Sequence, residues 1–121
     1  GMKRAILVTG ASKGIGLAAA HRLEAQGWSV IGTARAAPPS FPGAFVAVDL
    51  ADPAATQDLG AALAARGGVV GIVNNVGLTA HERFGEVDWA DFARVQDLNL
   101  RPALQLTQAL LPGMRAARFG R

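Results

Sequence analysis

The sequence contains no cysteine and no tyrosine, and it has only two histidines. Without cysteine the chain can have no disulfide, no thiolate nucleophile and no thiolate metal site. His21 falls in an expected helix and His81 in an expected loop, far apart in the sequence. Two imidazoles placed in this way do not make a cluster of metal ligands, so we expect no metal site.

Charged residues are also sparse, at 17% of the chain against 50% hydrophobic residues, with a formal net charge of +3. This balance favours a buried sheet over a disordered or nucleic-acid-coating chain. The basic residues are scattered, except for Arg115, Arg118 and Arg121 near the end. Their spacing is typical of a solvated helix end, where positive charge is favoured. We therefore expect no nucleic-acid partner.

Long apolar runs are missing as well. The apolar segment Ala5–Val8 is too short for the hydrophobic region of a signal peptide, and it leads directly into a glycine-rich turn. No run approaches the length needed to cross a bilayer. We expect a cytoplasmic protein that does not bind membranes.

Short apolar, β-branched runs alternate with longer amphipathic stretches along the chain. The runs predict strands and the stretches predict helices, with Asp52 and Pro53 as a typical helix start. The last helix is expected to be interrupted at Asn99 and Pro112. Strands separated by helices predict βαβ units and a parallel sheet, in one α/β domain of residues 1–121. The expected strands are residues 5–9, 29–33, 45–48 and 69–73, and the expected helices are residues 14–26, 53–66 and 89–119.

The stretch from Thr9 to Gly16 reads Thr-Gly-Ala-Ser-Lys-Gly-Ile-Gly, between the first expected strand and the first expected helix. At this place the backbone amides of a helix N-terminus can meet a pyrophosphate. Gly10 permits a tight turn, Gly14 a close phosphate approach, and Gly16 close packing of helix on strand. No P-loop signature follows, so phosphoryl transfer is not supported. The alternative is a glycine-rich turn that only reverses the chain.

This turn resembles the TGxxxGxG turn of the short-chain dehydrogenase/reductase family. Three further segments resemble family elements in the same order: Asp49-Leu50, Asn74–Gly77 with Val76 in place of the usual alanine, and Asn99 in the last helix. The resemblance covers essentially the whole chain. It implies a doubly wound, three-layer Rossmann-type sheet with strand order 3-2-1-4, and a nicotinamide dinucleotide cofactor. The cofactor contacts that it implies are Gly10, Ser12, Lys13, Gly14, Ile15, Gly16, Arg35, Asp49, Leu50, Asn75, Val76 and Gly77.

Each of these elements also has a purely structural interpretation. Asn74 and Asn75 could satisfy backbone groups where a strand turns into a loop, and Asp49 could be a helix-start signal. Asn99 is unfavourable inside a helix, so it could mark a break between two helical segments. In the family, the corresponding asparagine helps to hold a water near a catalytic lysine.

The cofactor is expected to be NADP(H) rather than NAD(H). An NAD-specific site of this kind places a carboxylate about 20 residues beyond the glycines, where it binds the ribose 2′-hydroxyl. Here no acidic residue lies between Glu24 and Asp49, and Arg35 follows the second expected strand. A guanidinium there can hold a 2′-phosphate, and Lys13 could add a second positive charge. The alternative is that Arg35 is an ordinary surface residue.

The resemblance also implies residues that this sequence does not contain. Reductases of the family use a Tyr-xxx-Lys pair with a preceding serine, in which the tyrosine transfers the proton. This chain has no tyrosine, and Asn99 is the only counterpart of a catalytic position. We expect the chain to be inactive alone, as the NADP(H)-binding portion of an oxidoreductase that is truncated before its fifth strand. The alternative is a natural non-catalytic nucleotide-binding or interaction module. The residues present do not indicate a substrate.

A sheet that ends at the fourth strand is expected to have an open, apolar edge. The last helix also carries more apolar surface than such a sheet can cover. These two features predict a homo-oligomer, formed through the C-terminal helix or across the open edge. The apolar residues concerned are Leu98, Leu104, Leu106, Leu110, Leu111 and Met114.

Overall fold

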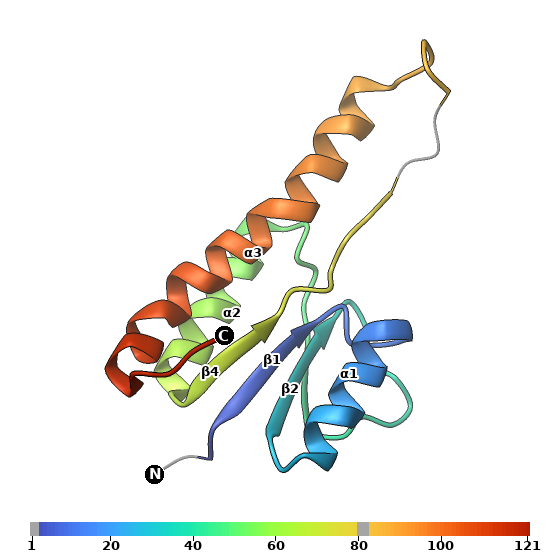
Figure 1. The fold of residues 1–121 in the computed structure, drawn as a ribbon. Helices are drawn as coiled ribbons and strands as arrows, with labels where there is room; N and C mark the ends of the chain where they lie inside the picture. The colour runs from blue at the N-terminus through green and yellow to red at the C-terminus, as the bar shows by residue number, and fades with distance from the viewer. Residues whose placement is uncertain (1–2, 80–82) are drawn as a thin grey trace.

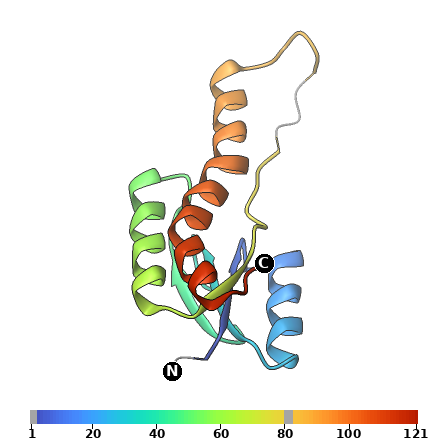
Figure 2. The ribbon, with the colours of Figure 1, turned by 60° about the vertical axis from the view of Figure 1, so that its left-hand side comes forward.

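The computed structural model describes residues 3–79 and 83–121, and within these ranges it forms one parallel sheet of four strands in the order β3-β2-β1-β4. Helix α1 covers one face of the sheet, and α2 and α3 cover the other (Figures 1 and 2). The expected doubly wound α/β fold and its strand order 3-2-1-4 are confirmed. The elements are β1 (Ala5–Thr9), α1 (Gly14–Ala25), β2 (Ser29–Ala34), β3 (Ala44–Ala47), α2 (Pro53–Arg66), β4 (Val69–Val73) and α3 (Trp89–Ala117).

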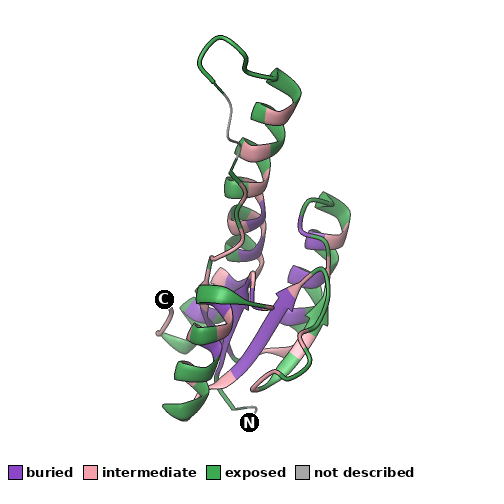
Figure 3. Ribbon diagram, turned by 90° about the vertical axis from the view of Figure 1, so that its right-hand side faces the viewer, coloured by how far each residue is buried: buried purple, intermediate pink, exposed green. Residues whose placement is uncertain are grey.

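Strand β1 lies at the centre and is buried along its whole length. Because side chains alternate across a strand, Leu7 packs into the cluster formed with α2 and α3, while Val8 packs into the cluster on the α1 side. The buried residues are concentrated in the strands and in the helix faces next to them (Figure 3). Two apolar layers therefore hold the sheet between its helices.

Helix starts follow the sequence closely. The Asp52 carboxylate accepts hydrogen bonds from the amides of Ala54 and Ala55 at 3.0 and 3.2 Å, with Pro53 as the first residue of α2. Asp88 caps α3 in the same way, accepting from Ala90 N at 2.9 Å. Helix α1 differs, because Lys13 at its cap position makes no side-chain capping hydrogen bond. The first amides of α1 are therefore not satisfied by a capping side chain.

The long helix α3 runs for 29 residues without interruption, through Asn99, Pro102 and Pro112. The expected breaks at Asn99 and Pro112 are wrong. The Asn99 side chain points away from α3 and forms hydrogen bonds with the backbone of Leu78, so it does not compete with the backbone hydrogen bonds of its own helix. The upper turns of α3 extend beyond the sheet (Figure 1). Among the described residues, no helix is both long and apolar enough to cross a membrane.

The outer side of β4 is occupied at its centre by the end of the chain. Arg121 N donates to Val70 O at 3.0 Å, and Ile72 N donates to Arg121 O at 2.9 Å, in the pattern of a parallel ladder. The Phe119 ring stacks on Trp28 with 6.2 Å between the ring centroids. The expected open edge on β4 is therefore corrected at one point, because Arg121 pairs with it, while β4 remains an edge strand of the four-stranded sheet.

Candidate functional site

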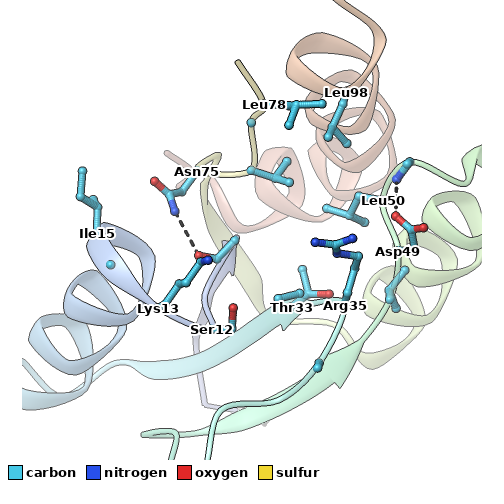
Figure 4. Close-up of a pocket in the computed structure, with 18 of the residues that line it drawn as sticks. Ser12, Lys13, Ile15, Thr33, Arg35, Asp49, Leu50, Asn75, Leu78 and Leu98 are labelled. Atoms are coloured by element: carbon cyan, nitrogen blue, oxygen red, sulfur yellow. Dashed lines mark hydrogen bonds between the residues drawn. The ribbon is translucent and has the colours of Figure 1, made fainter. Parts of the chain in front are cut away.

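An open cavity of about 880 Å³ lies at the carboxyl ends of the strands (Figure 4). The segments that follow all four strands contribute to it, together with one face of α3. Ligands of open α/β sheets bind at this edge, where neighbouring strands send their connections to opposite faces. The residues that line the cavity are Gly10, Ser12, Lys13, Gly14, Ile15, Thr33, Ala34, Arg35, Ala36, Val48, Asp49, Leu50, Ala51, Asn75, Val76, Gly77, Leu78, Arg94 and Leu98.

The turn between β1 and α1 brings backbone to the cavity without side chains in the way. Gly10 and Gly14 have φ angles of +61° and +57°, a conformation that L side chains rarely adopt. Gly14 lines the cavity, and a Cβ atom there would have open space around it, with no other protein atom within 4 Å. Since the start of α1 has no capping side chain, its amides and its positive dipole end are available to an anion.

Gly16 has a different role, because it does not line the cavity. A Cβ atom there would lie 2.7 Å from Asn75 Nδ2 and 2.9 Å from the carbonyl carbon of Gly10. Asn75 Nδ2 also donates to Gly10 O at 3.1 Å. The absence of a side chain at Gly16 therefore lets α1, the turn and the segment after β4 meet.

A buried threonine joins the segment after β4 to the turn after β1. Thr9 Oγ1 accepts hydrogen bonds from Asn75 N at 2.9 Å and Val76 N at 3.0 Å, and donates to Val73 O at 3.3 Å. Thr9 is fully buried, where an unpaired hydroxyl would be unfavourable, and the protein itself supplies partners for both its donor and its acceptor positions. The sequence reasoning did not include Thr9 among the site residues, although a hydroxyl at the end of a buried strand is the signal that could have found it.

Asn99 lies next to the cavity rather than in its lining. Its Oδ1 accepts from Leu78 N at 2.7 Å and its Nδ2 donates to Leu78 O at 3.0 Å. A Cβ atom at Gly77 would lie 3.1 Å from the same Oδ1. The side chain therefore holds the segment after β4 against α3, while its predicted catalytic role stays a prediction.

Three cationic side chains line the cavity: Lys13 from the turn after β1, Arg35 directly after β2, and Arg94 from α3. The guanidinium of Arg35 extends into the cavity (Figure 4). Within the described part of the chain, neither Lys13 nor Arg35 has an ion-pair partner. Arg94, in contrast, forms an ion pair with Asp91 at 3.2 Å. An anionic ligand would thus meet two positive side chains that are not already neutralised.

The Asp49 side chain bends back on its own loop, where Oδ1 accepts from Ala51 N at 3.0 Å. Leu50 is buried beside it and contributes to the same wall of the cavity. Asp49 precedes α2 but does not cap it, because Asp52 does. The interpretation of Asp49 as the start signal of this helix is therefore wrong, since the capping carboxylate lies three residues later.

The structure brings together at one cavity every predicted cofactor contact except Gly16, which packs behind it. The residues that the sequence reasoning missed come from the ends of the strands and from α3. Thr33, Ala34 and Ala36 flank Arg35 and could have been found by extension of the second strand. Leu78 and the two residues of α3 depend on contacts between distant segments, which no local pattern reports. The missed lining residues are Thr33, Ala34, Ala36, Val48, Ala51, Leu78, Arg94 and Leu98.

Residues 3–79 and 83–121 contain no group of three or more histidine, cysteine, aspartate or glutamate side chains that could hold a metal ion. His21 is an exposed residue of α1. His81 lies outside the described residues.

Strand order, the glycine turn and the uncapped start of α1 together define a Rossmann-type nucleotide-binding protein. The family model described as short chain dehydrogenase matches residues 4–121. The chain belongs to this family of oxidoreductases, as its sequence motifs indicate.

Similar proteins agree with this assignment. The chain is 35% identical over 127 residues to 3-oxoacyl-[acyl-carrier-protein] reductase FabG of Vibrio cholerae, a match that covers 95% of this chain and 51% of that protein. A crystal structure of a short-chain dehydrogenase from Streptomyces avermitilis has a TM-score of 0.86 at 34% identity, over 99% of this chain and 47% of that one. The chain spans about half the length of the curated relatives it matches.

A third similar structure contains a nucleotide. It is a protein from Beutenbergia cavernae, described as a candidate NAD(P)-dependent gluconate 5-dehydrogenase, with NADP bound at low occupancy. Its TM-score is 0.88 at 31% identity, over 98% of this chain and 51% of that one. This fold therefore accommodates a nicotinamide dinucleotide in a similar protein.

Proposed function

We propose that the chain binds NADP(H) in the cavity at the carboxyl edge of its sheet, as the cofactor-binding part of a short-chain oxidoreductase that interconverts a carbonyl and an alcohol. The observation that carries the choice of NADP(H) is Arg35, which lines the cavity directly after β2. NAD-specific sites place a carboxylate near this point, whereas a guanidinium favours a 2′-phosphate. Lys13 lines the same cavity and adds to the positive charge.

The residues present fit the parts of such a cofactor. Gly14 and the first amides of α1 would hold the pyrophosphate, because no Cβ atom blocks their approach and no side chain caps them. Arg35 and Lys13 would hold the 2′-phosphate. The wall formed by Val48, Asp49 and Leu50 would lie against the adenine end, which the glycine turn separates from the nicotinamide end.

When bound, the nicotinamide ring supplies or takes the hydride in this chemistry. The residues of this chain would bind and orient it, but they include no tyrosine to transfer the accompanying proton. We therefore expect NADP(H) binding without measurable turnover by these 121 residues alone. Turnover that appears when a separately produced C-terminal half of a similar reductase is added would support the oxidoreductase role. Tight NADPH binding without any restored turnover would favour a non-catalytic nucleotide-binding module.

The experiment that tests cofactor binding is a calorimetric titration of the chain with NADPH and then with NADH. NADPH should bind at least about tenfold more tightly than NADH, since a charge-assisted hydrogen bond contributes about 1.5–3 kcal/mol. Arg35→Ala should remove this preference, whereas Arg115→Ala, on an exposed residue in the last turn of α3, should retain it. Equal affinity for the two cofactors would contradict the NADP(H) assignment. Binding of neither would contradict the proposed function.

The proposed protein partner is a second copy of the chain, packed through α3. Leu100 and Leu104 are 58% and 59% exposed, and Trp89 and Leu111 lie on the same side of the helix at helical spacing. None of these four side chains belongs to the two core clusters. Because another face of α3 packs on the core through Leu106 and Leu110, this exposed apolar stripe is free to pack against its own copy about a two-fold axis. Arg121 already pairs with β4, so α3 is the better candidate of the two surfaces considered.

A further inference from the structure

Arg101 of α3 extends away from its helix to the loop between β3 and α2. Its Nη2 donates to Leu50 O at 2.9 Å and to Ala51 O at 3.2 Å. The side chain is only 20% exposed, which is low for an arginine on a surface helix. Leu50 and Ala51 both line the cavity, whereas Arg101 itself does not. The guanidinium therefore holds a wall of the cavity from behind.

The guanidinium is itself held in place from its own helix. Asp97, one turn earlier, accepts from Nε at 2.8 Å and from Nη2 at 2.8 Å. Gln105, one turn later, accepts from Nη1 at 2.6 Å. The Arg101 hydrogen bond lowers the pKa of the Asp97 carboxyl, because it favours the ionised carboxylate that pairs with the guanidinium. With all three guanidinium nitrogens bonded, Arg101 has little freedom to leave the loop.

The same loop is also tied to the start of α2. Thr56 is fully buried, and its Oγ1 lies 2.9 Å from Asp52 O and 3.2 Å from Leu50 O, so its single hydrogen is shared between these two carbonyls. Gln105 Nε2 donates to Pro53 O at 3.1 Å. The carbonyl of Leu50 is thus bound from both helices that cover this face of the sheet. The wall is fixed relative to the core by several hydrogen bonds rather than by packing alone.

Two residues before Arg101, Asn99 binds both backbone groups of Leu78, which lines the cavity from the segment after β4. One short stretch of α3 therefore holds two separate loops of the cavity. Positions 99 and 101 are fixed relative to each other by the helix backbone. The distance between the two loops that they hold is therefore set by α3. A polar side chain at each of these two positions is needed for this arrangement.

We infer that Arg101 is a positioning residue for the adenine end of the cofactor, acting through the Leu50–Ala51 wall that it holds. The inference rests on the proposed NADP(H) binding. Arginine suits the role better than lysine, because its planar fork binds two carbonyl groups and the Asp97 carboxylate at the same time. Lysine could replace only part of this network. Loss of the guanidinium would free the wall while the glycine turn and Arg35 remain in place.

The test titrates NADPH and 2′,5′-ADP, which contains only the adenine end, into the unaltered chain, Arg101→Gln, Arg101→Lys and the control Arg115→Gln. All titrations are done well below each variant's unfolding temperature, so that incomplete folding does not lower the apparent affinity. Arg101→Gln should weaken both ligands by about tenfold, and Arg101→Lys by an intermediate factor. Arg115→Gln should bind both ligands like the unaltered chain. If Arg101→Gln does not fold, the lysine variant carries the comparison.

The outcomes separate this inference from the proposed function. If the unaltered chain binds NADPH but the Arg101 variants bind both ligands equally well, the positioning role is wrong and the proposed function stands. A loss for NADPH without a loss for 2′,5′-ADP would also overturn it, because the wall would then not serve the adenine end. If the unaltered chain binds neither ligand, the proposed function itself fails.

Discussion

Asn99 on α3 binds both backbone groups of Leu78, accepting from its amide at 2.7 Å and donating to its carbonyl at 3.0 Å. The amide side chain thus pairs with the backbone of a residue beyond the end of β4, where no neighbouring strand is available as a partner. Backbone groups that lose such a partner are exposed to competing water, and the segment loses its fixed position. Leu78 lines the cavity, so the same pair of hydrogen bonds contributes to its shape.

Replacing Asn99 by alanine should lower the free energy of unfolding by about 1 kcal/mol, since two hydrogen bonds at an exposed position are removed. It should also weaken NADPH binding. Chemical denaturation and calorimetry measure the two effects. Gln108→Ala, at an exposed position of the same helix, is the matched control and should leave both unchanged. An Asn99→Ala chain as stable and as tight a binder as the unaltered one would show that Leu78 needs no such partner.

Gly14 and Gly16 should respond differently to alanine, although they are two residues apart. Gly16→Ala forces a Cβ atom against Asn75 and Gly10, so it should cost about 2 kcal/mol or more of stability. Gly14→Ala meets no protein atom, and its positive φ angle should cost only about 1–2 kcal/mol. Gly14 lines the cavity at the proposed phosphate contact, so the added methyl group and the strained backbone should lower NADPH affinity by about tenfold or more. Gly14→Ala binding NADPH normally would argue against phosphate contact at this turn.

Asp97 should make a small, pH-dependent contribution to stability. The hydrogen bond from Arg101 lowers the pKa of this carboxyl, with partial opposition from desolvation and added attraction from the charge of Arg101. A depressed folded-state pKa stabilises the chain above the unfolded value of about 3.9 and loses that effect as the pH falls through the folded value. Thermal unfolding from pH 7 to pH 2 should show a stability difference between the unaltered chain and Asp97→Asn that shrinks below about pH 4. A difference that grows as the pH falls would have the wrong sign.

Self-association through α3 can be tested with one charge on its apolar stripe. Leu104→Glu should shift the chain toward the monomer in analytical ultracentrifugation, because a carboxylate would be buried between the two copies. The side chain is 59% exposed, so the free energy of unfolding of the monomer should change by no more than about 0.5 kcal/mol. Ala62→Glu introduces the same charge on an exposed position of α2 and should have no effect on association. An unaltered chain that is already a monomer at micromolar concentration would rule the dimer out.

Local patterns predicted the strands and the turn that contribute most of the cavity. The reason is physical: the cavity lies where strands end, and strand ends can be recognised from apolar runs that stop at glycine, arginine or asparagine. Leu78, Arg94 and Leu98 were missed, and so was the role of Arg101. The positions of Leu78 and Arg101 depend on which face of α3 meets a distant loop, as in the 21-residue separation between Asn99 and Leu78 and the 51-residue separation between Arg101 and Leu50. Asn99 was judged by helix propensity, which takes no account of a distant backbone partner.

The prediction of an open edge on β4 was also based on local sequence patterns alone. An apolar fourth strand predicts an open edge on its outer side, but the pairing of Arg121 with Val70 and Ile72 depends on how α3 ends. Arg118 has a left-handed conformation, with φ of 54°, and turns the chain back toward the sheet. A single positive φ angle at a non-glycine residue is not readable from the sequence.

The continuity of α3 has a consequence for how the chain loses its ligand. Leu106 and Leu110 anchor this helix in the core, while Asn99 and Arg101 on the same helix hold two loops of the cavity. Local unfolding that detaches α3 from the sheet would therefore release both loops together, while the hydrogen bonds among β1, β2 and β3 could remain. Affinity for the cofactor would then disappear at a lower denaturant concentration than the sheet, and hydrogen exchange in α3 would report the free energy of this partial opening.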